Sequence, residues 1–129
     1  MKWRNRAGRI LATIGSVVLF ASAILHFFAG YSTGFPALEG SNLQVGLQTA
    51  FRVVFLSVGW HWILLGVIAL VAAFKATAAR KALVLVCGLG VLMEAVAGAT
   101  IMGIFIGNEM IGAAGILIII GGLLFETAK

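Results

Sequence analysis

Four long apolar stretches dominate the pattern of hydrophobic and polar positions along this chain. They cover about residues 9–30, 51–74, 81–106 and 110–126. A bilayer core about 30 Å thick requires about 20 apolar residues in a helix, so each stretch has roughly the length needed to cross it. The stretches are continuous and do not alternate with a period of two, which favours helices over the strands of a barrel. The pattern predicts an all-α fold: one integral membrane four-helix bundle over residues 1–129.

The composition supports a membrane protein over a soluble domain. Hydrophobic residues make up 62% of the chain and charged residues 10%, whereas about a quarter of the residues of a soluble domain are charged. A domain this small leaves much of its surface outside its core, so the surplus apolar surface must face lipid. The net charge of +5 arises from basic residues at the ends of the apolar stretches. That placement indicates lipid headgroups and membrane topology and does not favour nucleic acid as a partner.

The distribution of charge between the connections predicts an orientation. The basic residues on one side of the predicted spans are Lys2, Arg4, Arg6, Arg9, Lys75, Arg80, Lys81 and Lys129. The other side carries Glu39 and Glu109, with Arg52 at the boundary. By the positive-inside rule, both termini and the middle connection are cytoplasmic. The stretch Ala21-Ser22-Ala23 resembles a signal-peptidase site, but the apolar run continues past it to full spanning length, so we expect the first span to be retained.

The longest connection, YSTGFPALEGSNLQVGLQTAF, is predicted to lie outside. Gly34 and Pro36 indicate a turn. Gln44, Gln48 and Arg52 follow at intervals of four and form a polar stripe on one helix face. We therefore expect a short interfacial helix before the second span, with Arg52 near the headgroups. The stripe is interpreted as a solvated helix entrance, with contact to a ligand as the alternative.

Small residues predict the faces on which the helices pack, because they allow close approach. The predicted seam of the first span is Gly8, Ala12, Gly15, Leu19, Ser22 and His26. The second is Ser57, His61, Leu65, Ile68 and Ala72, and the third is Cys87, Gly90, Glu94, Ala97 and Gly98. The fourth is Gly112, Gly115 and Gly122.

Three ionisable residues lie on these seams at a similar predicted depth. At 1.5 Å per residue, His26, His61 and Glu94 are about 24, 20 and 20 Å from the cytoplasmic boundary. Ser22 and Ser57 each precede a histidine by four residues, which permits local hydrogen bonds. The pattern predicts a shared polar layer in the outer half of the membrane.

Three interpretations of this layer remain open. It fixes the register of the helices, or it forms a small-molecule or proton-handling site, because ionisable groups within a membrane are functional candidates. Alternatively, His26 and His61 bind haem b or, with Glu94, a metal, and Met93 or Met102 adds a softer contact. The sequence contains no CxxCH attachment motif, and the most economical expectation is that no cofactor is bound.

Three segments are similar to the DoxX-like group of small four-span bacterial membrane proteins. They are TIGSVVLFASAILHF in the first span, TGFPAL in the outer connection and HWILLGVIALVAA in the second span. The resemblance implies the same four-span architecture and a bacterial cytoplasmic (inner) membrane. Such proteins often carry an acidic residue in the second span, where this chain has His61, so the resemblance carries over no site residue.

Several function classes follow from these observations. The leading hypothesis is a non-catalytic protein: an accessory or assembly subunit of a larger membrane complex, or a self-associating bundle. The first alternative binds an apolar small molecule, such as a quinone or a lipid, with His26, His61 and Glu94 at the polar end of the site. A proton-coupled transporter is a further alternative. An enzyme is least favoured, because no nucleophile and base are recognisable together.

Overall fold

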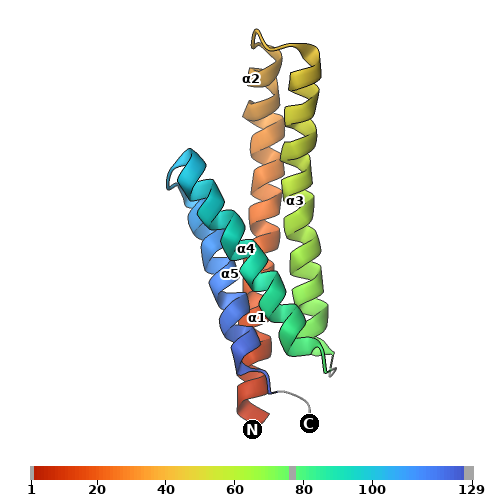
Figure 1. Ribbon diagram of the computed structural model, residues 1–129, viewed down its shortest axis with the longest axis vertical. Helices are drawn as coiled ribbons and strands as arrows, with labels where there is room; N and C mark the ends of the chain where they lie inside the picture. Colours follow the sequence, from red (N-terminus) through yellow and green to blue (C-terminus); the bar gives the residue numbers. More distant parts are fainter. Residues whose placement is uncertain (1, 76–77, 127–129) are drawn as a thin grey trace.

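The structure, a computed structural model, describes residues 2–75 and 78–126 and is helical throughout its regular elements (Figure 1). The elements are α1 (Lys2–Ala29), the π-helical segment η1 (Gly30–Gly34), α2 (Phe35–Glu39), α3 (Val45–Phe74), α4 (Arg80–Met102) and α5 (Ile106–Leu124). Four helical stretches are long and apolar enough to cross a membrane: Lys2–Glu39, Val45–Phe74, Arg80–Met102 and Ile106–Leu124. The predicted all-α fold with four such helices is confirmed.

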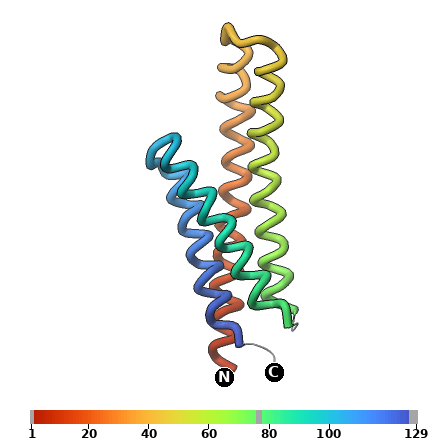
Figure 2. The backbone as a smooth tube through the Cα atoms, in the orientation of Figure 1, coloured from red at the N-terminus to blue at the C-terminus, as the bar shows by residue number. Residues whose placement is uncertain are grey.

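The four long helices form two hairpins that pack side by side. Helix α1 packs against α3 and α5, and α4 packs against the same two helices. The α4–α5 hairpin is shorter than the α1–α3 hairpin, and its loop ends well below the tip of α1–α3 (Figures 1 and 2). The distance between α4 and α3 increases towards that loop (Figure 1). The stretch from α1 to α2 has 38 residues, about 57 Å at 1.5 Å per residue, whereas α4 has 23, about 35 Å. Only the longer hairpin therefore extends far beyond the thickness of a bilayer core.

The end of the bundle that holds the N-terminus is closed by polar contacts around Asn5. Its side-chain oxygen accepts a hydrogen bond from Arg80 at 3.1 Å and one from the backbone N–H of Glu126 at 3.3 Å. The Arg80 guanidinium also lies 4.4 Å from the centroid of the Phe125 ring. These contacts bring α1, α4 and the end of α5 together at the basic end of the bundle.

The small-residue seam predicted for the first span is the buried face of α1. Gly8, Ala12, Gly15, Leu19 and Ser22 are all buried, whereas His26, the last residue of the predicted seam, is half-buried. A Cβ at Gly8 or at Gly15 would lie 2.8 Å from a carbonyl oxygen of α5. Glycine therefore permits α1 and α5 to touch backbone to backbone.

The seam predicted for the second span is wrong. The face of α3 that packs inside the bundle consists of Gly59, Trp62, Gly66, Ala69, Ala72 and Ala73, and Ala72 alone belongs to both sets. Ser57 and His61 are exposed, and Leu65 and Ile68 are half-buried. Apart from its polar first turns, hydrophobic residues are distributed almost evenly around α3, so the periodicity of its sequence gives no direction, and the shapes of α1 and α4 decide which face is covered.

The seam of the third span is correct in part. Cys87 is buried as predicted, but the other residues of the packed face are Val84, Gly88, Val91 and Ala95. Gly90, Glu94 and Gly98 are half-buried, and Ala97 is exposed. In α5, Gly115 and Gly122 are buried as predicted, whereas Gly112 is half-buried.

The outer connection also differs from its prediction. Gly34 and Pro36 do not form a turn, because the helix continues through η1 into α2, and the chain reverses only between Gly40 and Gln44. Pro36 lies in the first turn of α2, where its missing N–H has little consequence. No separate interfacial helix precedes the second span, because residues 45–52 are the first turns of the continuous helix α3.

Candidate functional site

The structure brings His61 of α3 and Glu94 of α4 together in a contact that is an ion pair when His61 is protonated. His61 Nδ1 contacts Glu94 Oε1, and Trp62 Nε1 donates a hydrogen bond to the other carboxylate oxygen, Oε2, at 2.5 Å. Trp62 is 7% exposed, whereas the side chains of His61 and Glu94 are 48% and 31% exposed. Two consecutive residues of α3 thus hold both oxygens of one carboxylate, one from inside the bundle and one from its surface.

This geometry defines the hydrogen-bonding roles in the pair. The indole N–H of Trp62 is only a donor, so Glu94 Oε2 is the acceptor. A carboxylate accepts through both oxygens, and the proton on Nδ1 then belongs to His61. When the imidazole is fully protonated, the pair has no net charge, which lowers its desolvation penalty relative to an isolated carboxylate.

His26 of α1 joins this arrangement through aromatic contacts. Its Nε2 donates to the backbone oxygen of Phe55 at 2.8 Å. Its ring stacks on the Phe55 ring, with centroids 3.7 Å apart and planes at 10°, and meets Trp62 edge-on at 4.9 Å. A Cβ at Gly59 would lie 3.2 Å from the imidazole, so glycine at this position allows the close approach of α1. Trp62 therefore lies between His26 and the His61–Glu94 pair.

The arrangement differs from the predicted metal or haem sites. Within residues 2–75 and 78–126, no group of three or more His, Cys, Asp or Glu side chains is positioned to hold a metal ion. His26 Nε2, the nitrogen furthest from its backbone, is already bound to the Phe55 carbonyl. Ligation of a haem through this nitrogen would require that bond to break.

The two serines do not bond to the histidines, contrary to the sequence prediction. The Ser22 hydroxyl donates to the carbonyl of Val18 at 2.9 Å, and that of Ser57 donates to the carbonyl of Val53 at 2.7 Å. A serine in a helix finds the carbonyl one turn before it at bonding distance without any change of backbone. Both hydroxyls are therefore used within their own helices.

The polar stripe before the second span closes the tip of the longer hairpin. Arg52 forms an ion pair with Glu39 at the end of α2, and its guanidinium lies 5.5 Å from the centroid of the Phe35 ring. Gln48 donates to the carbonyl of Leu43 at 3.0 Å, and Gln44 lies at the N-cap of α3 without a side-chain capping bond. Arg52 is nine residues from His61, about 13 Å along the helix, so the stripe and the ion pair are separate features.

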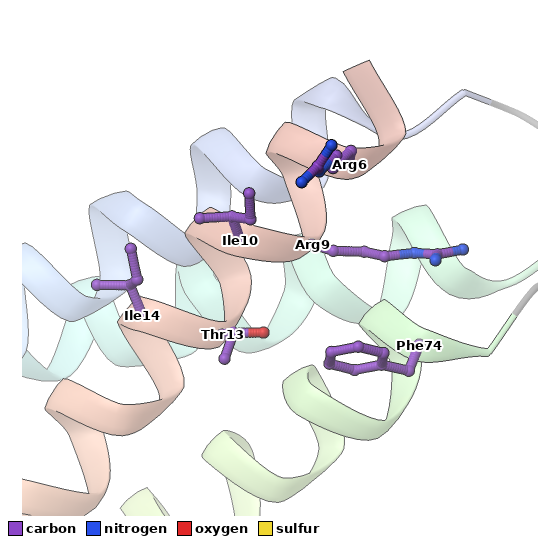
Figure 3. Close-up of a pocket in the computed structure, with 6 residues that line it drawn as sticks. All are labelled: Arg6, Arg9, Ile10, Thr13, Ile14 and Phe74. Atoms are coloured by element: carbon purple, nitrogen blue, oxygen red, sulfur yellow. The ribbon is translucent and has the colours of Figure 1, made fainter. Parts of the chain in front are cut away.

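Two open hollows lie at the ends of the α1–α3 hairpin. The outer one, about 310 Å³, is lined by Gly34, Phe35, Leu38, Leu43, Phe51 and Phe55. The inner one, about 370 Å³, lies at the basic end and is lined by Arg6, Arg9, Ile10, Thr13, Ile14 and Phe74 (Figure 3). Neither lining includes the His61–Glu94 pair, but Phe55 belongs to the outer hollow and also contacts His26.

Three residues of this site were not predicted from the sequence: Phe55, Gly59 and Trp62. Trp62 was the one with a readable signal, because an indole N–H near the middle of an apolar helix needs an acceptor. Phe55 contributes a backbone oxygen, and Gly59 contributes space, so neither has a side-chain signature. Comparisons of the chain with protein-family models, with curated proteins and with solved structures found no match.

Proposed function

We propose that this protein is a non-catalytic integral membrane subunit that associates laterally with other transmembrane helices. The association face is the surface of α3 and α4 that carries His61 and Glu94. We place the basic end of the bundle on the cytoplasmic side of a bacterial inner membrane, with both termini inside, because basic residues cluster there.

The half-exposed ion pair is the observation that carries this proposal. His61 is 13 residues from Phe74 and Glu94 is 13 residues from Lys81, which places both about 20 Å from the basic boundary and within the hydrocarbon region. A single charged group at the centre of a membrane costs about 2.5–3.5 kcal/mol on insertion scales. Mutual pairing lowers this penalty, but the exposed half of the imidazole still faces lipid. A neighbouring helix that covers the pair removes that contact.

The surroundings of the pair suit a close helix contact. Gly90 and Ala97 lie one turn before and after Glu94 on α4, and Ser57 lies one turn before His61 on α3. A Cβ at Gly90 would lie 3.6 Å from the Leu65 side chain, an ordinary van der Waals contact. Small residues on both sides of a polar group are typical of helix–helix interfaces in membranes.

A second copy of this chain is the partner that the charges favour. The face presents a donor and an acceptor side by side, so two copies related by a two-fold axis offer His61 to Glu94 in both directions. Such an exchange satisfies the exposed half of each group without a further charged residue.

The test measures the monomer–dimer equilibrium in lipid bilayers by single-molecule photobleaching of dye-labelled protein. His61→Leu and Glu94→Leu are expected to weaken association about 3- to 18-fold, because interhelical polar contacts contribute about 0.6–1.7 kcal/mol. Glu109→Gln is the control, because Glu109 is an exposed carboxylate in the first turn of α5. A wild-type protein that stays monomeric at every density, or variants that dimerise as well as the wild type, would contradict the proposal.

The outer hollow supports a second candidate function, the binding of an apolar ring compound such as a quinone. Its volume of about 310 Å³ is at the lower end of the range for small-molecule sites. Phe35, Phe51 and Phe55 supply aromatic walls. Native mass spectrometry with decylubiquinone tests this function: Phe51→Ala should reduce binding, and Phe28→Ala, at a residue that is 70% exposed, should not. Equal binding by both variants would exclude the outer hollow as the site.

A further inference from the structure

The inner hollow has an apolar lining, to which Arg6 and Arg9 contribute the stems of their side chains. It lies between α1 and the end of α3, at the basic end of the bundle. Figure 3 shows Arg6, Ile10 and Ile14 in succession along α1, while Arg9 runs alongside the ring of Phe74. The charged ends of Arg6 and Arg9 thus lie beside an apolar hollow, near the end of α1 where the N-terminus lies.

Two polar atoms beside this hollow are buried and have no partner in the structure. They are Arg9 Nε and Thr13 Oγ1. The ion pairs in the described part of the chain are Arg52–Glu39 and His61–Glu94, so neither Arg6 nor Arg9 is neutralised by a described carboxylate. A buried donor without an acceptor is destabilising unless a ligand or water supplies one.

We propose that the inner hollow binds an anionic phospholipid. The phosphate is held by the guanidinium groups of Arg6 and Arg9, and one acyl chain lies over Ile10, Ile14 and Phe74. Guanidinium is the group best matched to phosphate, because its donors form a planar fork. The position agrees with this ligand, since basic pockets on the cytoplasmic side of membrane helices are suited to anionic headgroups.

The apolar lining distinguishes a lipid from free phosphate as the source of the anion. Inorganic phosphate gains nothing from Ile10, Ile14 or Phe74, whereas an acyl chain buries apolar surface against them. A lipid site therefore requires the apolar hollow and the arginine head groups beside it, whereas a phosphate site requires only the arginines.

The experiment is native mass spectrometry of the full chain titrated with dioleoylphosphatidylglycerol. The double variant Arg6→Gln/Arg9→Gln is compared with Lys2→Gln/Arg4→Gln, which removes the same charge from the same end of α1 but spares the lining of the hollow. The first variant should bind the lipid about tenfold more weakly, and the second should bind nearly as well as the wild type. Far-UV circular dichroism confirms that both variants stay helical.

Two further arms separate the sources of the anion. Dioleoylphosphatidylcholine, whose headgroup is neutral overall, should bind the wild type weakly, and Phe74→Ala should reduce binding of the anionic lipid. Inorganic phosphate at millimolar concentration should not displace the lipid. Equal losses in the two double variants would overturn the proposal in favour of general attraction to basic residues. Full displacement by phosphate, with no effect of Phe74→Ala, would overturn it in favour of a simple anion site.

Discussion

Gly115 lies where α5 touches the backbone of α4, and its replacement by alanine tests the packing of the second hairpin. A Cβ at this position would lie 2.9 Å from the backbone nitrogen of Leu92 and 3.1 Å from the carbonyl oxygen of Gly88. Both neighbours are backbone atoms of a helix, so neither can rotate away. Only a separation of α4 from α5 accommodates the added methyl group.

Gly112 on the same helix provides the matched control. A Cβ there would lie 3.7 Å from the Cβ of Ala95, an ordinary van der Waals contact. Each glycine-to-alanine change increases the free energy of unfolding by about 0.5–1 kcal/mol through helix propensity. This gain is the same in both variants and cancels when they are compared. Overpacking at Gly115 costs about 1–3 kcal/mol. We therefore expect Gly115→Ala to be less stable than Gly112→Ala by about 2 kcal/mol.

The free energies of unfolding are measured by steric trapping in bicelles, with tryptophan fluorescence as a second reading. Gly88→Ala serves as a repeat from the other side of the contact, because its Cβ would lie 2.9 Å from the backbone nitrogen of Ile119. If Gly115→Ala is as stable as Gly112→Ala, then α4 and α5 do not touch backbone to backbone in the membrane, and the reasoning is refuted.

The remaining predictions concern the site and the orientation. Trp62→Phe removes the N–H that binds Glu94 and should lower the free energy of unfolding by about 0.6–1.7 kcal/mol. Trp60→Phe, at a residue that is 63% exposed, should change this free energy little. Equal effects of the two variants in the unfolding assay would count against the hydrogen bond. Added haemin should give no Soret band that depends on both His26 and His61, because His26 Nε2 is bound to a carbonyl; a six-coordinate spectrum lost in either alanine variant would contradict this expectation. In a cysteine-free background, a membrane-impermeant maleimide should label Ser41→Cys in intact cells and Ala79→Cys only after permeabilisation; the reverse result would invert the orientation.

The sequence predicted the depth of the polar layer along the helices but not the directions of its side chains. Counting residues from the basic boundary placed His61 and Glu94 at the same depth, and in the structure they meet. The depth of a residue does not determine the direction in which its side chain points from the helix. The sequence therefore did not predict that His61 is half-exposed or that Trp62 donates a hydrogen bond to the Glu94 carboxylate. His26 lies at a similar level, but the bulk of Trp62 separates it from the pair.

The sequence by itself determined the number of long apolar helices and the basic end of the bundle. Hydrophobicity and charge belong to each segment, and a helix satisfies its own backbone, so these features do not depend on neighbouring helices. The packed face of α1 was also determined locally, because its glycines and alanines recur at helical spacing. Tertiary structure alone decided which face of α3 is buried, because a helix with hydrophobic residues distributed almost evenly around it has no preferred direction until α1 and α4 pack against it. Tertiary structure also decided the conformation at Pro36, because proline is accepted both in a turn and in the first turn of a helix. Here Pro36 lies in the first turn of α2, which packs against α3.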